Sequence, residues 1–267
     1  MLLRRFMAHT KEQNWFAVGL DVIVVIVGIY LGMQVSDWND SNNKVKTEIQ
    51  YLTVLNQDLQ RIDERLLDKL EFEIAQAKLA NYVYELLSKD DFDSHKQLIA
   101  AGLNDLTIRR SAFFTSPVYI DLLSSGNLTI IRNEVLRNEV IAFFSELEFT
   151  ALILEKNSKQ FVDEGFVPLI RNNFSSLEDS SGLPDEYRSV VSKRFEGIVK
   201  DIVTTNISAQ TDPTLALPID NEIWPIIRRA LSWRFSVSLG DKNSVESIRT
   251  RGHELSKKIT AYLESLK

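Results

Sequence analysis

The chain opens with a long apolar run and then changes to a regular alternation of apolar and polar positions. From Val22 to Met33 the only polar side-chain group is the hydroxyl of Tyr30. With its flanks the run reaches about 20 residues, which is enough for one α-helix to cross a hydrocarbon core of roughly 30 Å. The pattern therefore predicts a transmembrane helix over residues 15–38.

The ends of this predicted span carry aromatic and basic residues. Trp15 and Trp38 lie 23 positions apart, so both indoles can reach the headgroup layers that amphipathic rings prefer. Arg4 and Arg5 belong to a basic segment, residues 1–14, which we expect to lie along anionic lipid. A buried core helix and a cleaved signal peptide are the alternatives, but the run has neither a polar face nor a small-residue cleavage site.

The orientation of the span rests on a small excess of positive charge. Arg4, Arg5 and Lys11 precede it, whereas only Lys44 and Lys46 follow closely. Basic residues favour the cytoplasmic side. We therefore predict a cytoplasmic N-terminus and an exported, periplasmic domain formed by residues 39–267.

Beyond the span, apolar residues recur at steps of three and four, the period of an amphipathic helix. They are Ile49, Leu52, Leu55, Leu59, Ile62, Leu66, Leu70 and Ile74. No proline interrupts residues 1–116 and no glycine interrupts residues 33–101. One helix can therefore run from the membrane toward Leu87, with its weakest point at residues 41–43.

The remaining chain also has helical spacing, broken by turn signals. We expect a turn at 89–94, followed by helices at 95–103 and 119–124 and by a third helix that begins after an N-cap at Asn133. Pro168 should end or kink the helical stretch in which it stands. Two further helices are expected, one at 185–203 and one from 221 onward, the second with a break at 240–241. Gly126 is expected to end the helix at 119–124. No convincing strand alternation occurs. The predicted class is all-α, a transmembrane helix continuing into a long-helix bundle.

Net charge and its distribution restrict the possible partners. A formal net charge of −6 argues against nucleic acid. Residues 48–93 carry eleven acidic and five basic side chains, whereas residues 222–267 carry nine basic and five acidic ones. Packing of these two segments against each other is the simplest use of the asymmetry.

Signatures of catalysis are absent from the sequence. There is no cysteine, the three histidines have no metal-binding spacing, and no nucleotide-binding or hydrolase motif occurs. Carboxylate pairs such as Asp63 with Glu64 fit a solvated face. We therefore expect no enzymatic activity, no metal and no cofactor.

The candidate functional residues lie inside the span. Asp21 is an ionisable group within the apolar layer, where such groups are costly and commonly functional. A wetted position near the cytoplasmic edge is the alternative. Gly28 and Gly32 form a G-x-x-x-G pair that lets two transmembrane helices approach closely, and Gln34 can hydrogen-bond across helices.

Two segments resemble a family of uncharacterised bacterial single-pass membrane proteins. The first combines a basic start, Asp21, Gly28 and Gly32 with the ending Gln34-x-x-x-Trp38-Asn39, and the second has Ser124-Ser125-Gly126-x-Leu128 before an Asn-capped helix. The resemblance implies a single span in the bacterial inner membrane followed by a helical domain. It implies no activity.

The sequence thus supports two functional hypotheses. In the first, the protein is a membrane-anchored partner-binding, scaffold or sensory module that forms a homo-oligomer or meets another membrane protein through its span. In the second, it is a subunit of an ion-driven or transport assembly that uses Asp21.

Overall fold

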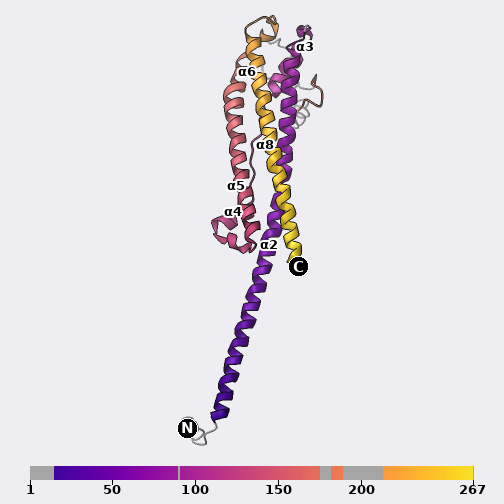
Figure 1. Ribbon diagram of the computed structural model, residues 1–267. Helices are drawn as coiled ribbons and strands as arrows, with labels where there is room; N and C mark the ends of the chain where they lie inside the picture. Colours follow the sequence, from indigo (N-terminus) through magenta and orange to yellow (C-terminus); the bar gives the residue numbers. More distant parts are fainter. Residues whose placement is uncertain (1–14, 90, 175–181, 189–212, 267) are drawn as a thin grey trace, which may run out of the picture.

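The computed structural model describes residues 15–89, 91–174, 182–188 and 213–266 (Figure 1). Its elements are the α-helices α2 (Trp15–Leu86), α3 (Phe92–Asp105), α4 (Pro117–Ser124), α5 (Glu134–Asn157), α6 (Val167–Asn173) and α8 (Ile223–Ser265), the π-helix η3 (Ser158–Phe166), and the 3₁₀ turns η2 (Asn127–Ile130) and η6 (Pro213–Ala216). The described residues contain no strand, and the all-α prediction is confirmed.

Helix α2 is one unbroken element of 72 residues, about 108 Å long at 1.5 Å per residue. It passes through Ser41, Asn42 and Asn43 without interruption, as expected from the lack of proline and glycine. Its first part projects alone from the bundle, and its second part forms one side of it (Figure 1). The boundary predicted at residue 39 is therefore not a break in the backbone.

The bundle is built around the antiparallel pair α2 and α8, with α5 packed against α8 (Figure 1). Apolar faces of the three helices enclose a lower core that includes Leu55, Leu147 and Ile248. A second core at the far end surrounds Trp224, which is fully buried. The predicted packing of the acidic segment against the basic segment is confirmed by this α2–α8 pairing.

The connection between α4 and α5 follows the sequence signals closely. The Ser116 hydroxyl accepts a hydrogen bond from the amide of Tyr119 and caps α4. Gly126 adopts φ = 70°, the left-handed conformation that glycine reaches without strain. The Asn133 side chain then accepts from the amide of Leu136 and caps α5. The Asn133 cap and the glycine turn are as predicted, whereas α4 begins two residues before the predicted start at residue 119.

Three expectations about the later helices need correction. Of the end or kink expected at Pro168, the end is wrong, because Pro168 stands in the first turn of α6, where the missing N–H is tolerated, directly after the π-helix η3. Helix α8 runs through Gly240 and Asp241 without a break. Residues 185–188 form a turn rather than the start of a helix, and residues 189–203 lie outside the described residues.

Candidate functional site

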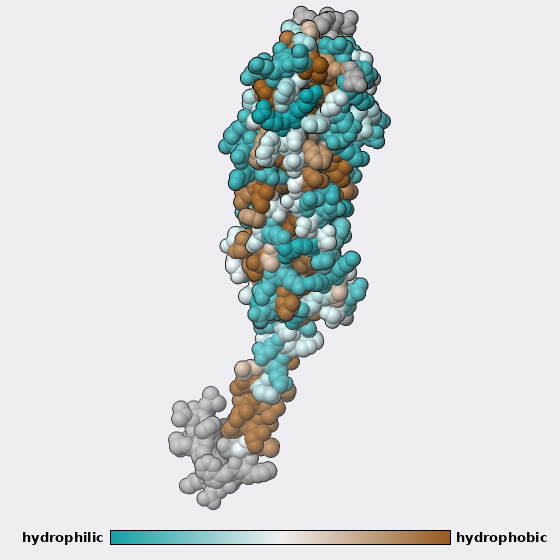
Figure 2. Space-filling model, turned by 45° about the horizontal axis from the view of Figure 1, so that its top comes forward, coloured by the Kyte–Doolittle hydropathy of each residue, from teal (hydrophilic) through white to brown (hydrophobic). Residues whose placement is uncertain are grey.

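The projecting part of α2 exposes a continuous apolar surface. Its large apolar side chains between Leu20 and Trp38 are about half exposed or more, and they form a separate hydrophobic cylinder below the bundle (Figure 2). This part is long and apolar enough for a membrane span, and none of its most apolar window is buried. In water such a surface would be costly, because soluble proteins rarely expose apolar patches larger than a few hundred Å².

The glycine pair lies open on this surface. Apart from the neighbouring residues and backbone of its own helix, a Cβ atom added to Gly28 or Gly32 would meet no atom within 4 Å. Gln34 is on a different side of the helix, about 160° from Gly32 at 100° per residue. Its Nε2 donates a 2.9 Å hydrogen bond to the Tyr30 hydroxyl. The structure therefore groups Gln34 with Tyr30 rather than with the glycines.

The other predicted membrane residues are placed only in part. Trp38 is 68% exposed at the end of the apolar surface, where an interfacial indole is expected. Trp15 and Asp21 belong to α2, but their side chains lie outside the described residues, as do Arg4 and Arg5.

The glycine face and the bundle lie on opposite sides of α2. Leu52 and Leu55, which are fully buried against the bundle, lie about 200° and 180° around the helix from Gly32 and Gly28, respectively. Because α2 is continuous between these positions, the bundle leaves the glycine face free. Nothing within the described residues covers that face.

A buried carboxylate joins three segments where the bundle begins. Glu48 is fully buried and accepts hydrogen bonds from the backbone amide of Arg132 (2.7 Å), from its Nε (2.6 Å) and from the Tyr262 hydroxyl (3.0 Å). It therefore ties the segment before α5 and the end of α8 to α2. Hydrophobic periodicity could not reveal this cluster, because its partners are 84 and 214 residues away.

A second polar cluster lies in the middle of the bundle. Lys69 pairs with Glu73 at 2.7 Å and donates to the carbonyl of Arg110 at 2.7 Å. Arg234 of α8 lies 3.9 Å from Glu73 and donates to Gln76 at 2.8 Å. All four side chains are buried, and burial lowers the pKa of Arg234. The sequence indicates this buried cluster only weakly, because its one sign is that Lys69 and Glu73 stand among the apolar positions of α2.

Asp241 lies beside this cluster on α8. Its Oδ1 accepts a 2.7 Å hydrogen bond from Asn157, the last residue of α5. Burial raises the pKa of Asp241 from 3.8 to about 6, and the nearby Glu73 adds to the rise. The hydrogen bond from Asn157 and the charges of Lys69 and Arg234 oppose it.

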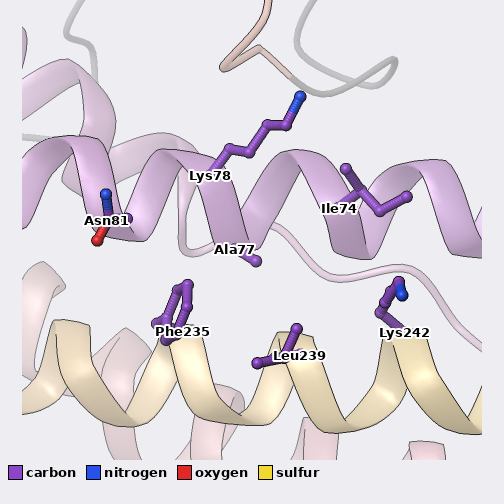
Figure 3. Close-up of a pocket in the computed structure, with 7 residues that line it drawn as sticks. All are labelled: Ile74, Ala77, Lys78, Asn81, Phe235, Leu239 and Lys242. Carbon is purple, nitrogen blue, oxygen red and sulfur yellow. The ribbon is translucent and has the colours of Figure 1, made fainter.

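The groove between α2 and α8 is lined mainly by apolar side chains. Ala77 of α2 faces Phe235 and Leu239 of α8, while Lys78 points away from the gap (Figure 3). Lys242 at one end is paired with Glu246 at 2.7 Å. The described residues also contain no group of three or more His, Cys, Asp or Glu suited to a metal ion.

Comparison with known proteins gives one match. No curated protein and no solved structure matches the chain. A family model matches residues 21–157, from the apolar segment of α2 to the end of α5, and covers about half of the chain. These residues include the second of the two resembling segments and the part of the first that begins at Asp21, but not its basic start. The chain belongs to the family of unknown function DUF6090.

Proposed function

We propose that the protein is a single-pass membrane-anchored helical module that associates with itself through its span and binds a partner through its bundle. One observation carries the proposal: α2 runs without a break from an exposed apolar segment into a folded bundle. Such a helix fixes the bundle to the bilayer. The location we propose is the bacterial inner membrane, with the bundle in the periplasm.

The exposed glycine pair supports self-association. Glycines spaced by four residues let two helix backbones approach closely within a bilayer. Because the bundle packs on the opposite side of α2, two copies can meet at Gly28 and Gly32 without contact between their bundles. The symmetric form of such a contact is a two-fold dimer.

The continuity of α2 supports a scaffold or sensory role. A rotation or tilt of the span is passed to the bundle, because no loop intervenes to absorb it. Ligand- or partner-induced changes in the bundle would be passed to the span in the same way. We propose binding rather than catalysis as the activity of the bundle, since its buried polar residues bond mainly to one another.

Cysteine crosslinking tests the proposed dimer. The chain has no cysteine, so a single introduced one reports one position. Val25 lies about 40° from the centre of the glycine face, and Ile23 about 160° from it. In native membranes, Val25→Cys should form a disulfide-linked dimer under mild oxidation, and Ile23→Cys should not.

Two further results decide the outcome. Adding Gly28→Leu and Gly32→Leu to Val25→Cys should remove the crosslink while the protein stays in the membrane fraction. Equal crosslinking from Val25→Cys and Ile23→Cys, or a crosslink that survives both leucines, would rule out this interface.

A subunit of an ion-driven assembly is the second candidate. Asp21 precedes Gly28 by seven residues, which places the two positions about 20° apart around α2. An ionisable residue on the same face as a close helix contact could serve an ion path between subunits. Asp21→Asn should then abolish the cellular phenotype of the protein while the Val25→Cys crosslink persists. Retention of the phenotype would leave Asp21 a structural role only.

A further inference from the structure

A pocket with polar and apolar walls lies where α2 leaves the apolar segment and first meets the bundle. Its volume is about 450 Å³, within the range of small-molecule sites. Residues 40, 43, 44 and 47 of α2 line one side of the pocket at helical spacing. The end of η2 and Arg132, which follows it, line the other side. The polar residues that line it are Asp40, Asn43, Lys44, Thr47, Thr129 and Arg132.

Several polar groups of this pocket are free to bind a ligand. Within the described ranges, the side chains of Asp40, Lys44 and Thr129 have no hydrogen-bond or ion-pair partner. Arg132 uses its backbone amide and Nε on Glu48, and its side chain also interacts with the Tyr262 hydroxyl, so that only part of its five N–H donors remains available. The pocket therefore offers an ammonium, a guanidinium edge, a hydroxyl and a carboxylate.

The lower end of the pocket lies at the height of the lipid headgroups. Asp40 is about 3 Å and Lys44 about 9 Å beyond Trp38 along the helix axis. The headgroup layer extends roughly 5–7 Å beyond the hydrocarbon core, and a lysine side chain can reach several Å toward it. With Trp38 at the interface, Asp40 lies within this layer and Lys44 lies just beyond it, within reach of its side chain.

The charges of the pocket select among headgroups. Glu48 and Arg132 neutralise each other, so Lys44 and Asp40 remain as one positive and one negative charge. A phosphate ester that also carries a primary amine matches this arrangement: its phosphate oxygens accept from Lys44, Arg132 and Thr129, and its ammonium donates to Asp40. A purely anionic headgroup would meet the Asp40 carboxylate without compensation.

We propose that this pocket binds the phosphoethanolamine headgroup of a bilayer lipid and so fixes the base of the bundle to the membrane surface. The inference rests on the membrane anchoring proposed above. It adds a second, chemically specific contact with the bilayer.

Native mass spectrometry of the full chain tests the proposal. The protein is released from nanodiscs containing equal amounts of phosphatidylethanolamine, phosphatidylglycerol and phosphatidylcholine, and the retained lipid is identified. Phosphatidylethanolamine should be retained preferentially. Lys44→Ala should reduce its retention about tenfold, the effect of losing one charge-assisted hydrogen bond. Lys46→Ala, an exposed lysine of α2 outside the pocket, should leave retention unchanged.

Further arms separate the ligand sources and the two proposals. Asp40→Asn should lower the preference for phosphatidylethanolamine over phosphatidylglycerol. Displacement of the lipid by soluble glycerophosphoethanolamine at equal concentration would overturn a lipid ligand. Equal losses in Lys44→Ala and Lys46→Ala, or no lipid preference in a chain that enters nanodiscs, would overturn the pocket alone. Failure of the wild-type chain to enter nanodiscs would overturn the anchor as well.

Discussion

Asn157, at the end of α5, donates a 2.7 Å hydrogen bond to the carboxylate of Asp241 in the middle of α8. The contact lies where α5 passes into the π-helix η3, and it is next to Gly240, where the sequence suggested a break. The buried carboxylate thus connects two helices at the height of the Lys69–Glu73–Arg234 cluster.

The pKa of Asp241 predicts how stability depends on pH. The folded chain binds this proton up to about pH 6, whereas the unfolded chain releases it near 3.8. Between these values the folded state holds more protons, so the free energy of unfolding should fall as the pH rises, by about 2–3 kcal/mol from this group. Asp241→Asn should flatten this window and stabilise the protein at pH 7. Urea unfolding of both proteins at several pH values, followed by circular dichroism, measures the difference; a less stable variant with an unchanged pH slope would contradict the assignment.

The Lys69–Glu73 pair should show strong coupling. Lys69→Met leaves a buried carboxylate with Arg234 at 3.9 Å as its nearest cation, and should cost about 3–5 kcal/mol. Adding Glu73→Leu removes the uncompensated charge, so the double variant should lose clearly less than the sum of the single losses. A double-mutant cycle by equilibrium unfolding measures the coupling, and simple additivity would show that the pair does not act as a unit.

Asp63 does not lie on a solvated face, as was expected, but faces α8. Its carboxylate receives Arg249 Nε at 2.8 Å and His253 Nε2 at 2.7 Å from α8. Burial raises the pKa of Asp63, but these hydrogen bonds outweigh it, and the pKa lies below the ordinary value. Its stabilising effect is therefore complete above the unfolded pKa near 3.8 and is lost as the pH falls below that value.

Substitution of Asp63 tests this bridge, and substitution of the neighbouring Glu64 is its control. Asp63→Asn should destabilise the bundle by about 1 kcal/mol at pH 7, since the pair is partly exposed to solvent, and the effect should shrink in high salt. Glu64→Gln, at the exposed neighbouring position, should change stability little. Equal effects from both substitutions in thermal unfolding would argue against a specific bridge.

Replacement of two glycines by alanine should change the stability of the protein in opposite directions. Gly126 has φ = 70° and open space around it, so Gly126→Ala is disfavoured by backbone strain alone, by about 1–2 kcal/mol. Gly240 lies inside α8, also in open space, and Gly240→Ala should stabilise the helix by up to about 1 kcal/mol. Thermal unfolding of the two variants distinguishes the cases; a stabilising Gly126→Ala would exclude the strained turn.

The sequence predicts the helices better than the contacts between their polar residues. Helical periodicity locates α2 and α8, and the Ser116 and Asn133 caps follow from local hydrogen bonding. The partners of Glu48 and Asp63 do not follow from it, because they depend on how α8 and the segment before α5 pack against α2. The continuity at Gly240 was also hidden, since a glycine weakens a helix locally while packing against α2 and α5 maintains it.

In the candidate site, too, some features can be predicted from the sequence and others require the structure. The apolar run, Gly28, Gly32 and Trp38 are readable from composition and spacing. That Gln34 lies away from the glycines follows from helix geometry, and its bond to Tyr30 needed the structure. The pocket beside Lys44 combines residues about 85 positions apart, so the fold alone brings them together.

Depth-dependent quenching of a fluorophore tests the membrane anchor most directly. Single cysteines at Ile29, Trp38 and Asn43 are labelled with an environment-sensitive dye in the otherwise cysteine-free chain, reconstituted in vesicles. The account predicts that the label at Ile29 is quenched by lipids brominated deep in their chains and protected from aqueous iodide, that the label at Trp38 is intermediate, and that the label at Asn43 is quenched by iodide. Equal iodide quenching at Ile29 and Asn43 would contradict a span.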